Sequence, residues 1–309
     1  MKLNPGIYAA QLVPYDENGR VKENSLALMV RRNIELNALD GLYIGGSTGE
    51  AFLADANARE RTLEICAEAA GPASSRKVSL VAQVGSLNIK EAEKLARLAS
   101  SLGYDAVSAV TPYYYKFSFE ETKAYYTRLA SAAGLPMLVY SVPALTGTSF
   151  DITQSAELYS NPLVAGFKYT SGDLYTMERL ITAFPERLVF SGYDELLMLG
   201  RALGAYGAIG STYNLFAPLA HKIWKLMGQG KVSEARAAQA SLNGAIQELA
   251  ALGLYQALKE IISMDGIDAG VCLPPFAPLS DAKKAKAREI GQNMARMGYF
   301  ERSTRCAEK

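Results

Sequence analysis

The residue whose type and position best suit it to a chemical reaction is Lys168, which follows the apolar run LVAGF at residues 163–167. Such a run predicts a buried β-strand, so the lysine would stand at a strand end with apolar walls around it. Desolvation disfavours the ammonium form and lowers the pKa of a lysine, leaving a neutral amine that can attack a ketone. The resulting iminium would weaken an adjacent carbon–carbon bond without a metal or organic cofactor. From position alone, a lysine that reaches solvent at a strand end remains the alternative.

Hydroxyl groups that could assist this chemistry follow two other predicted strands. Tyr140 ends an apolar run and could act as a general acid and base, although alone it is also an ordinary strand-ending aromatic. The turn GGSTG at residues 45–49 has neither the lysine of a phosphate-binding loop nor the spacing of a dinucleotide fingerprint. Its backbone N–H groups and the hydroxyls of Ser47 and Thr48 would form a neutral cradle for a carboxylate. The alternative is a tight βα turn whose polar residues bind no ligand.

Two further clusters follow predicted strands. Asp194 and Glu195 come directly after a Gly-Tyr pair, and their carboxylates are acceptors suited to polyol hydroxyls. Carboxylates that complement a helix dipole are the alternative interpretation of this pair. The cluster TPYYY at residues 111–115 is too aromatic for an ordinary exposed loop, so it predicts a lid or a subunit contact.

The composition argues against several other classes of site and partner. A single histidine, His221, makes imidazole triads and multi-histidine metal sites unlikely to be the basis of catalysis, so we expect no metal and no cofactor. Cys66, Cys272 and Cys306 share no metal-ligand or redox spacing, which favours a reducing cytoplasm. The net charge of +1, without blocks of like charge, predicts neither nucleic acid nor a membrane surface as partner. We also expect no export signal and no membrane-spanning segment.

Short apolar runs alternate with longer segments of helical periodicity, the pattern of βα units around a parallel sheet. We predict an α/β fold, a (β/α)8 TIM barrel over residues 1–230, with a C-terminal helical extension over residues 231–309 packed on the barrel as one structural unit. An open doubly wound sheet is the alternative, because periodicity does not reveal closure. The predicted strands are residues 7–13, 41–46, 78–84, 106–110, 137–140, 164–168, 188–191 and 207–210, and the helices include 57–70, 89–102, 119–133 and 174–184.

Because reactive residues of a barrel lie at the carboxyl ends of its strands, these motifs have to be considered together. Together they resemble the pyruvate-dependent class I aldolases of the N-acetylneuraminate lyase and dihydrodipicolinate synthase type, over most of the barrel. The loop GGSTGE at residues 45–50 resembles the family's pyruvate-carboxylate loop, Tyr140 its proton-relay tyrosine and GFKYT at 166–170 its Schiff-base strand. Residues 105–112, 117–121, 171–175 and 210–214 are similar to bacterial N-acetylneuraminate lyases in particular.

The resemblance implies reversible cleavage of N-acetylneuraminate into pyruvate and N-acetylmannosamine. Lys168 would form the imine, Tyr140 would relay the proton of the C4 hydroxyl, and Ser47 with Thr48 would hold the carboxylate. Tyr114 matches an aromatic that reaches across a subunit interface, which places it with the catalytic groups of a homotetramer. The remaining matches are substrate-binding positions: Thr170, which would orient the acceptor end, and Gly192, Asp194, Glu195 and Ser211, which would grip the polyol and amide portion.

One position separates the branches of this family. Dihydrodipicolinate synthases usually carry an arginine in the loop after the relay tyrosine, and the matching residue is Leu145. A leucine makes no bidentate contact with a carboxylate, so a carboxylate-bearing aldehyde is a poor candidate. A sibling aldolase acting on another 2-keto-3-deoxy sugar acid, or a dihydrodipicolinate synthase-like enzyme, is the alternative, and a catalytically silent sugar-acid sensor is a further one. The chain departs from the family's pattern at three places: Val13 replaces a common threonine, Ser141 stands where many members carry asparagine, and residues 274–276 lack the basic residue often found before the Pro-Phe pair. These differences bear on substrate preference more than on reaction class.

Overall fold

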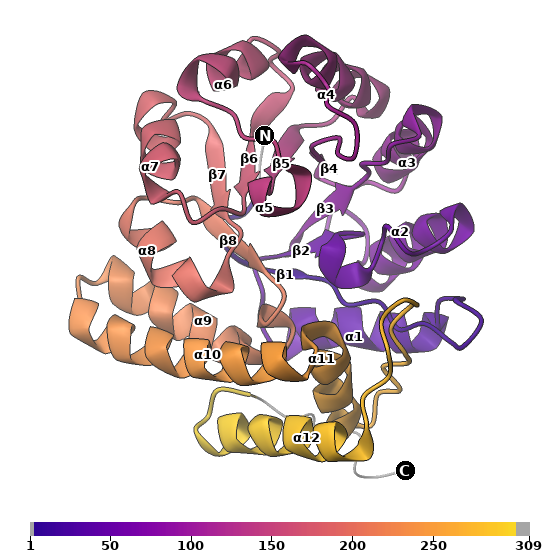
Figure 1. The fold of residues 1–309 in the computed structure, drawn as a ribbon, viewed down its shortest axis with the longest axis vertical. Helices are drawn as coiled ribbons and strands as arrows, with labels where there is room; N and C mark the ends of the chain where they lie inside the picture. Colours follow the sequence, from indigo (N-terminus) through magenta and orange to yellow (C-terminus); the bar gives the residue numbers. More distant parts are fainter. Residues whose placement is uncertain (1–2, 301–309) are drawn as a thin grey trace.

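Eight parallel strands close into a barrel in the computed structural model, which describes residues 3–300. Each strand pairs with its sequence neighbours, and β1 pairs with β8 to complete the ring (Figure 1). This closure confirms the predicted TIM barrel and excludes the open doubly wound sheet. The strands are β1 (Gly6–Ala10), β2 (Gly41–Ile44), β3 (Ser79–Gln83), β4 (Ala106–Val110), β5 (Met137–Ser141), β6 (Val164–Tyr169), β7 (Leu188–Ser191) and β8 (Gly207–Gly210).

Helices surround the barrel and connect successive strands. Several begin where a side chain accepts a hydrogen bond from the first turn, as Asp55, Ser118 and Asp151 do, which is the expected start signal of a helix. The helices are α1 (Glu23–Glu35), α2 (Ala56–Ala70), α3 (Ile89–Ser101), α4 (Phe119–Ala133), α5 (Pro143–Thr146), α6 (Ile152–Tyr159), α7 (Leu174–Ala183), α8 (Leu197–Ala202), α9 (Tyr213–Gly228), α10 (Val232–Leu252), α11 (Leu254–Ile262) and α12 (Asp281–Arg296), with single 3₁₀ turns η1 (Ser47–Gly49), η2 (Asp194–Leu196) and η3 (Ser263–Asp265).

All eight predicted apolar runs become strands, and the four predicted helices end within one residue of α2, α3, α4 and α7. The largest difference is at the first strand, where β1 ends at Ala10 although the apolar run continues to Val13. Both Leu12 and Val13 are fully buried, so this part of the run packs as core without joining the barrel ladder. Hydrophobicity alone does not separate these two outcomes.

Apolar side chains form two cores on the two faces of the sheet. One lies between the strands and the surrounding helices, and the other fills the barrel interior. Large aromatics such as Tyr8, Tyr43 and Phe190 belong to the inner core, and Tyr8 meets Phe190 edge to face at 5.1 Å between ring centroids. The barrel is therefore a packed core rather than a pore, and the space for a ligand lies at its mouth.

The last three helices lie together on one side of the barrel (Figure 1). Helix α10 packs along α9 and touches η2 at the barrel mouth, and α11 packs between α10 and α12. The chain after residue 230 thus reaches the mouth as well as the outer wall. Within residues 3–300, no helix is long and apolar enough to cross a membrane. Cys66 and Cys272 are unpaired thiols, and Cys306 lies outside the described residues.

Gly166 of β6, the register partner of Leu188 on β7, gives the first testable prediction. A Cβ atom at Gly166 would lie 1.8 Å from the carbonyl oxygen of Leu188, a backbone atom that has no room to move. We expect Gly166→Ala to destabilise the protein by about 3 kcal/mol or more, measured by thermal unfolding. The control is Gly244→Ala in α10, where nothing lies within 4 Å and alanine should stabilise the helix by about 0.5–1 kcal/mol. Equal melting temperatures for the two variants would contradict this account.

Candidate active site

A cavity of about 270 Å³ lies at the carboxyl ends of the barrel strands. Its walls come from β5, β6 and β8, from the loops after β2 and β7, and from α10 and α11. All but one of the site residues predicted from the sequence line this single cavity, and the exception is Tyr114. The predicted residues brought together are Ser47, Thr48, Tyr140, Lys168, Thr170, Gly192, Asp194, Glu195 and Ser211.

Lys168 points from β6 into the cavity and is only 4% exposed. Its Nζ lies 3.8 Å from the ring centroid of Tyr140 and 4.1 Å from that of Tyr43. Tyr140 is its register partner on the neighbouring strand β5, which fixes the distance between the two side chains. Burial lowers the pKa of Lys168 below its ordinary value, although Tyr140 and Asp194 oppose this effect. The cavity therefore makes the Lys168 amine easier to deprotonate than an exposed lysine, which is the direction of the pKa shift that the sequence predicts.

The Tyr140 hydroxyl lies 3.5 Å from the Ser47 hydroxyl, within the limit for a hydrogen bond. Burial alone would raise the pKa of this phenol, but the positive charge of Lys168 and the Ser47 contact outweigh it, so the pKa of Tyr140 is lowered. A phenol of this kind gives up a proton more readily than an isolated buried tyrosine. Tyr140 is thus placed to exchange a proton with a group bound beside Lys168.

The turn after β2 carries the two hydroxyls predicted to bind a carboxylate. Gly45 adopts a positive φ of +74°, and Ser47 and Thr48 then begin the 3₁₀ turn η1. N–H groups at the start of a helical turn have no partner within it, so they point outward beside the hydroxyls. The Thr48 hydroxyl also contacts the Ser211 hydroxyl at 2.7 Å, which ties this turn to the end of β8.

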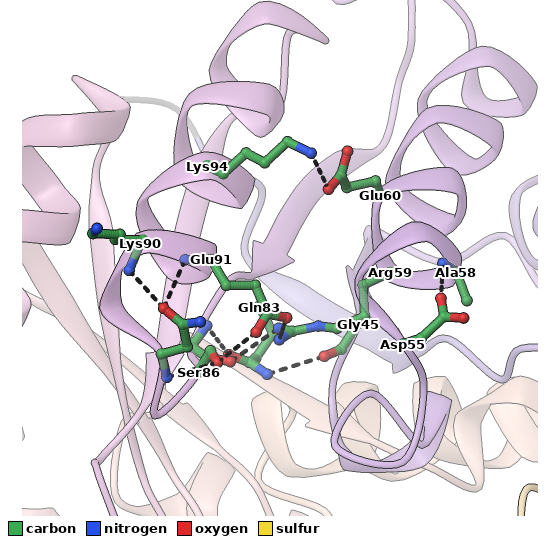
Figure 2. Close-up of polar contacts among 12 residues, drawn as sticks. Gly45, Asp55, Ala58, Arg59, Glu60, Gln83, Ser86, Lys90, Glu91 and Lys94 are labelled. Atoms are coloured by element: carbon green, nitrogen blue, oxygen red, sulfur yellow. Dashed lines mark hydrogen bonds and ion pairs between the residues drawn. The ribbon is translucent and has the colours of Figure 1, made fainter.

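Side chains behind the turn hold its first residue in place. Figure 2 shows the Gln83 amide directed at Gly45, where its Nε2 donates to the Gly45 carbonyl at 3.0 Å. Gln83 also accepts a hydrogen bond from the backbone N–H of Gly85. Arg59 of α2 fixes that second loop, since it donates to the Gly85 carbonyl at 2.9 Å. Arg59 also pairs with Glu91 at 2.8 Å (Figure 2). The loops after β2 and β3 are therefore held as one unit.

Asp194 is the buried member of the carboxylate pair, whereas Glu195 is exposed. One Asp194 oxygen accepts from the Thr212 backbone N–H at 2.8 Å and from its hydroxyl at 2.6 Å. The other oxygen lies where a Cβ at Gly210 would stand, so only glycine leaves room for it. Burial raises the pKa of Asp194 to about 6, because desolvation outweighs the two hydrogen bonds from Thr212. Asp194 and Glu195 lie in the first turn of η2, as the helix-dipole alternative expected, but the Asp194 carboxylate accepts its hydrogen bonds from Thr212.

Thr170 and Gly192 form a second close pair at the mouth. A Cβ at Gly192 would lie 1.9 Å from the Thr170 hydroxyl oxygen, so glycine is needed for the threonine to stand where it does. This buried hydroxyl has no hydrogen-bond partner among residues 3–300. A buried polar atom of this kind loses solvation unless a ligand or water satisfies it. Thr170 is therefore available to a bound ligand.

Two groups of residues differ from the sequence-based picture. Tyr114 is 85% exposed, with a φ of +75°, and lies away from the cavity of its own chain. Conversely, three residues that the sequence analysis does not predict belong to the site: Tyr43, Ile246 and Tyr255. The sequence predicts Tyr43 only as part of a strand, and Tyr255 lies on α11, whose docking at the mouth depends on tertiary packing. No local sequence signal identifies such residues as part of a site.

The closed barrel, with a buried lysine and several hydroxyl and carboxyl side chains lining a cavity at the carboxyl ends of its strands, defines a barrel enzyme. Comparison with known proteins gives the family: residues 4–293 match the dihydrodipicolinate synthetase family, and the chain belongs to it. The N-acetylneuraminate lyase of Fusobacterium nucleatum is 42% identical over 285 residues, covering 92% of this chain and 97% of that protein.

Two solved structures show the same relationship in three dimensions. The structure of CdNal from Clostridium difficile in complex with mannosamine has a TM-score of 0.90 at 40% identity, covering 96% of this chain and 99% of that one. The Fusobacterium nucleatum N-acetylneuraminate lyase complexed with pyruvate has a TM-score of 0.88 at 41% identity, covering 94% of this chain and 97% of that one.

Asp194 gives a prediction about stability and pH. Its pKa of about 6 in the folded protein lies above the ordinary value of 3.8, so the folded state binds the proton more tightly than the unfolded state. Between these values stability falls as pH rises, and at neutral pH the buried charge costs free energy. We expect Asp194→Asn to raise the melting temperature more at pH 8 than at pH 4.

The control is Glu195→Gln, which changes the exposed neighbouring carboxylate and should have little effect at either pH. A melting-temperature change for Asp194→Asn that is the same at both pH values would contradict the assignment.

Proposed function

We propose that this protein is a class I aldolase that cleaves N-acetylneuraminate reversibly to N-acetylmannosamine and pyruvate through a Schiff base on Lys168. The observation that carries the proposal is the buried Lys168 amine, in contact with Tyr140 and in one cavity with the Ser47–Thr48 turn. Similarity to N-acetylneuraminate lyases over more than nine-tenths of the chain supports the same substrate.

The first step of the proposed reaction is attack of the neutral Lys168 amine on the C2 ketone of the open-chain sugar acid. A carbinolamine forms, and loss of water gives an iminium that serves as the electron sink. The adjacent carboxylate binds the Ser47 and Thr48 hydroxyls and the N–H groups at the start of η1, which orients C2 towards Nζ. Neither a metal nor an organic cofactor takes part in this scheme.

Carbon–carbon cleavage follows when Tyr140 removes the proton of the C4 hydroxyl. The C4 oxygen becomes the carbonyl of N-acetylmannosamine, the C3–C4 bond breaks, and its electron pair forms the enamine of bound pyruvate. Protonation at C3 and hydrolysis of the imine then release pyruvate and regenerate the amine. The lowered pKa of Tyr140 fits a group that takes and returns a proton in this cycle.

The far side of the cavity supports a polyol as the rest of the substrate. Thr170 would orient the acceptor end, and Gly192, Asp194, Glu195 and Ser211 would contact its hydroxyl and amide groups. Leu145, 71% exposed on α5, lines the same cavity and offers no positive charge to a second carboxylate. This favours a sugar over the carboxylate-bearing aldehyde of a dihydrodipicolinate synthase.

We also propose that the enzyme is a cytoplasmic homotetramer in which Tyr114 reaches the neighbouring subunit's site. Tyr114, Tyr115 and Phe117 are exposed and stack edge to face, with ring centroids 5.1 Å and 6.1 Å apart. Exposed aromatic clusters are typical of subunit contacts. The unpaired thiols Cys66 and Cys272 suit a reducing compartment.

Borohydride trapping tests the Schiff base. With pyruvate present, we expect reduction to attach pyruvate irreversibly to Lys168, as located by mass spectrometry of peptides. Because burial lowers the pKa of Lys168, the trapping rate should rise with pH and level off below 10.5, the ordinary value for lysine. Lys168→Arg is the control, since a guanidinium forms no such adduct. Wild-type protein left unmodified, under conditions that trap a known aldolase, would exclude the mechanism.

A cleavage assay tests the substrate. We expect release of pyruvate and N-acetylmannosamine from N-acetylneuraminate, with much slower cleavage of 2-keto-3-deoxygluconate. Tyr140→Phe should lower kcat by about 10²–10⁴-fold, the usual contribution of a general acid–base group. Undetectable N-acetylmannosamine together with rapid cleavage of 2-keto-3-deoxygluconate would favour the sibling aldolase instead.

A further inference from the structure

A buried ion pair joins the carboxylate-binding turn to the C-terminal helices, outside the cavity itself. Glu50, directly after η1, pairs with Lys259 of α11 at 2.7 Å, and their side chains are 0% and 3% exposed. Taking two charges out of water costs free energy that their attraction need not repay, so such a pair is weak evidence of stabilisation. Because the pair lies beside the turn, its role can be to position the turn rather than to stabilise the fold.

The backbone of Glu50 is held in an unusual conformation. Its φ of +56° lies in the left-handed region, which residues other than glycine seldom adopt. Its N–H donates to the Ser47 carbonyl at 3.0 Å, so this conformation shapes the end of the turn that carries both hydroxyls. A residue in this region persists only when its surroundings fix it.

The surroundings of Glu50 come from the chain after residue 250. One carboxylate oxygen meets Lys259, and the other accepts from the Leu273 backbone N–H at 2.5 Å. Lys259 donates a second hydrogen bond, to the Val271 carbonyl at 2.6 Å. Tyr15 adds a third link, since its hydroxyl donates to the Gly49 carbonyl at 2.9 Å and its ring lies 5.2 Å from Lys259 Nζ.

The same helix also forms part of the cavity wall. Tyr255, which lines the cavity, precedes Lys259 by four residues on α11. Residues with this spacing lie on the same face of a helix. One face of α11 therefore carries both its attachment to the turn and the phenol that lines the cavity, so the ion pair links the turn to this part of the cavity wall.

We propose that Glu50 and Lys259 are positioning residues that set the enzyme's affinity for the substrate carboxylate. The pair fixes the position of the Ser47–Thr48 turn relative to α11. Without it, Glu50 leaves its left-handed backbone conformation and the turn changes shape. This inference rests on the proposed function, because the ligand in question is the carboxylate of pyruvate. Neither residue contacts the reacting atoms, so the effect is on binding more than on chemistry.

The test measures how borohydride trapping of Lys168 depends on pyruvate concentration. For Lys259→Met and Glu50→Gln we expect the half-saturating pyruvate concentration to rise about tenfold, because a small displacement of a positioning group costs this much or more. The maximal trapping rate should fall much less. The double variant should recover part of the affinity lost in Lys259→Met, since it leaves no lone buried charge.

The matched control is Asp265→Asn. Asp265 pairs with Arg32 at 2.8 Å, also buried and also joining the C-terminal part of the chain to the barrel, but its charged partner lies on α1 and not on the turn. We expect this variant to lower the melting temperature while the half-saturating pyruvate concentration stays within about twofold of wild type. A general loss of stability is thereby separated from a loss of positioning.

If Lys259→Met does not accumulate as folded protein, Lys259→Arg and Glu50→Asp serve in its place, because they keep both charges and change only the fit. Folded variants of the pair with an unchanged half-saturating concentration would overturn the proposal. A wild-type protein that pyruvate does not modify would instead contradict the Schiff-base function, and this inference with it. The two failures are therefore distinguishable.

Discussion

Burial removes water from the Lys168 amine, so the aromatic rings around it are its main electrostatic partners. The faces of Tyr43 and Tyr140 lie within about 4 Å of Nζ and stabilise the charged form when it occurs. Burial nevertheless lowers the pKa of the amine, which raises the share of the neutral form relative to an exposed lysine. An exposed lysine would keep its ordinary pKa, and a smaller fraction of it would be neutral beside the turn and the phenol.

Closure of the barrel is what brings these groups together, and it explains why so much of the site was predictable. Once the apolar runs are assigned to strands of one parallel barrel, every residue just after a run lies at the same mouth. Lys168, Tyr140 and the Ser47–Thr48 turn needed no further information. The resemblance to a known family then supplied the roles that position alone left open.

What the sequence did not reveal depends on tertiary packing. Tyr255 and Lys259 lie on α11, and nothing in their local sequence distinguishes a helix that reaches the mouth from one on the outer wall. Tyr43 was hidden because a tyrosine within an apolar run is equally suited to core packing. The sequence analysis named Gly192 as a substrate-binding position but not the steric reason for a glycine: Gly192 and Gly210 make room for Thr170 and Asp194, which is visible only when side chains from different loops are placed side by side.

The attachment of Glu50 to the segment at residues 271–273 also has a consequence for synthesis of the protein. A ribosome completes all eight strands by residue 210, well before Lys259 and Leu273 emerge. A nascent barrel at that stage carries Lys168 and its hydroxyl partners but has a lone carboxylate beneath the turn, which favours an open arrangement exposed to water. The turn, and the cavity wall that α10 and α11 provide, therefore reach their final arrangement only when the last third of the chain has docked.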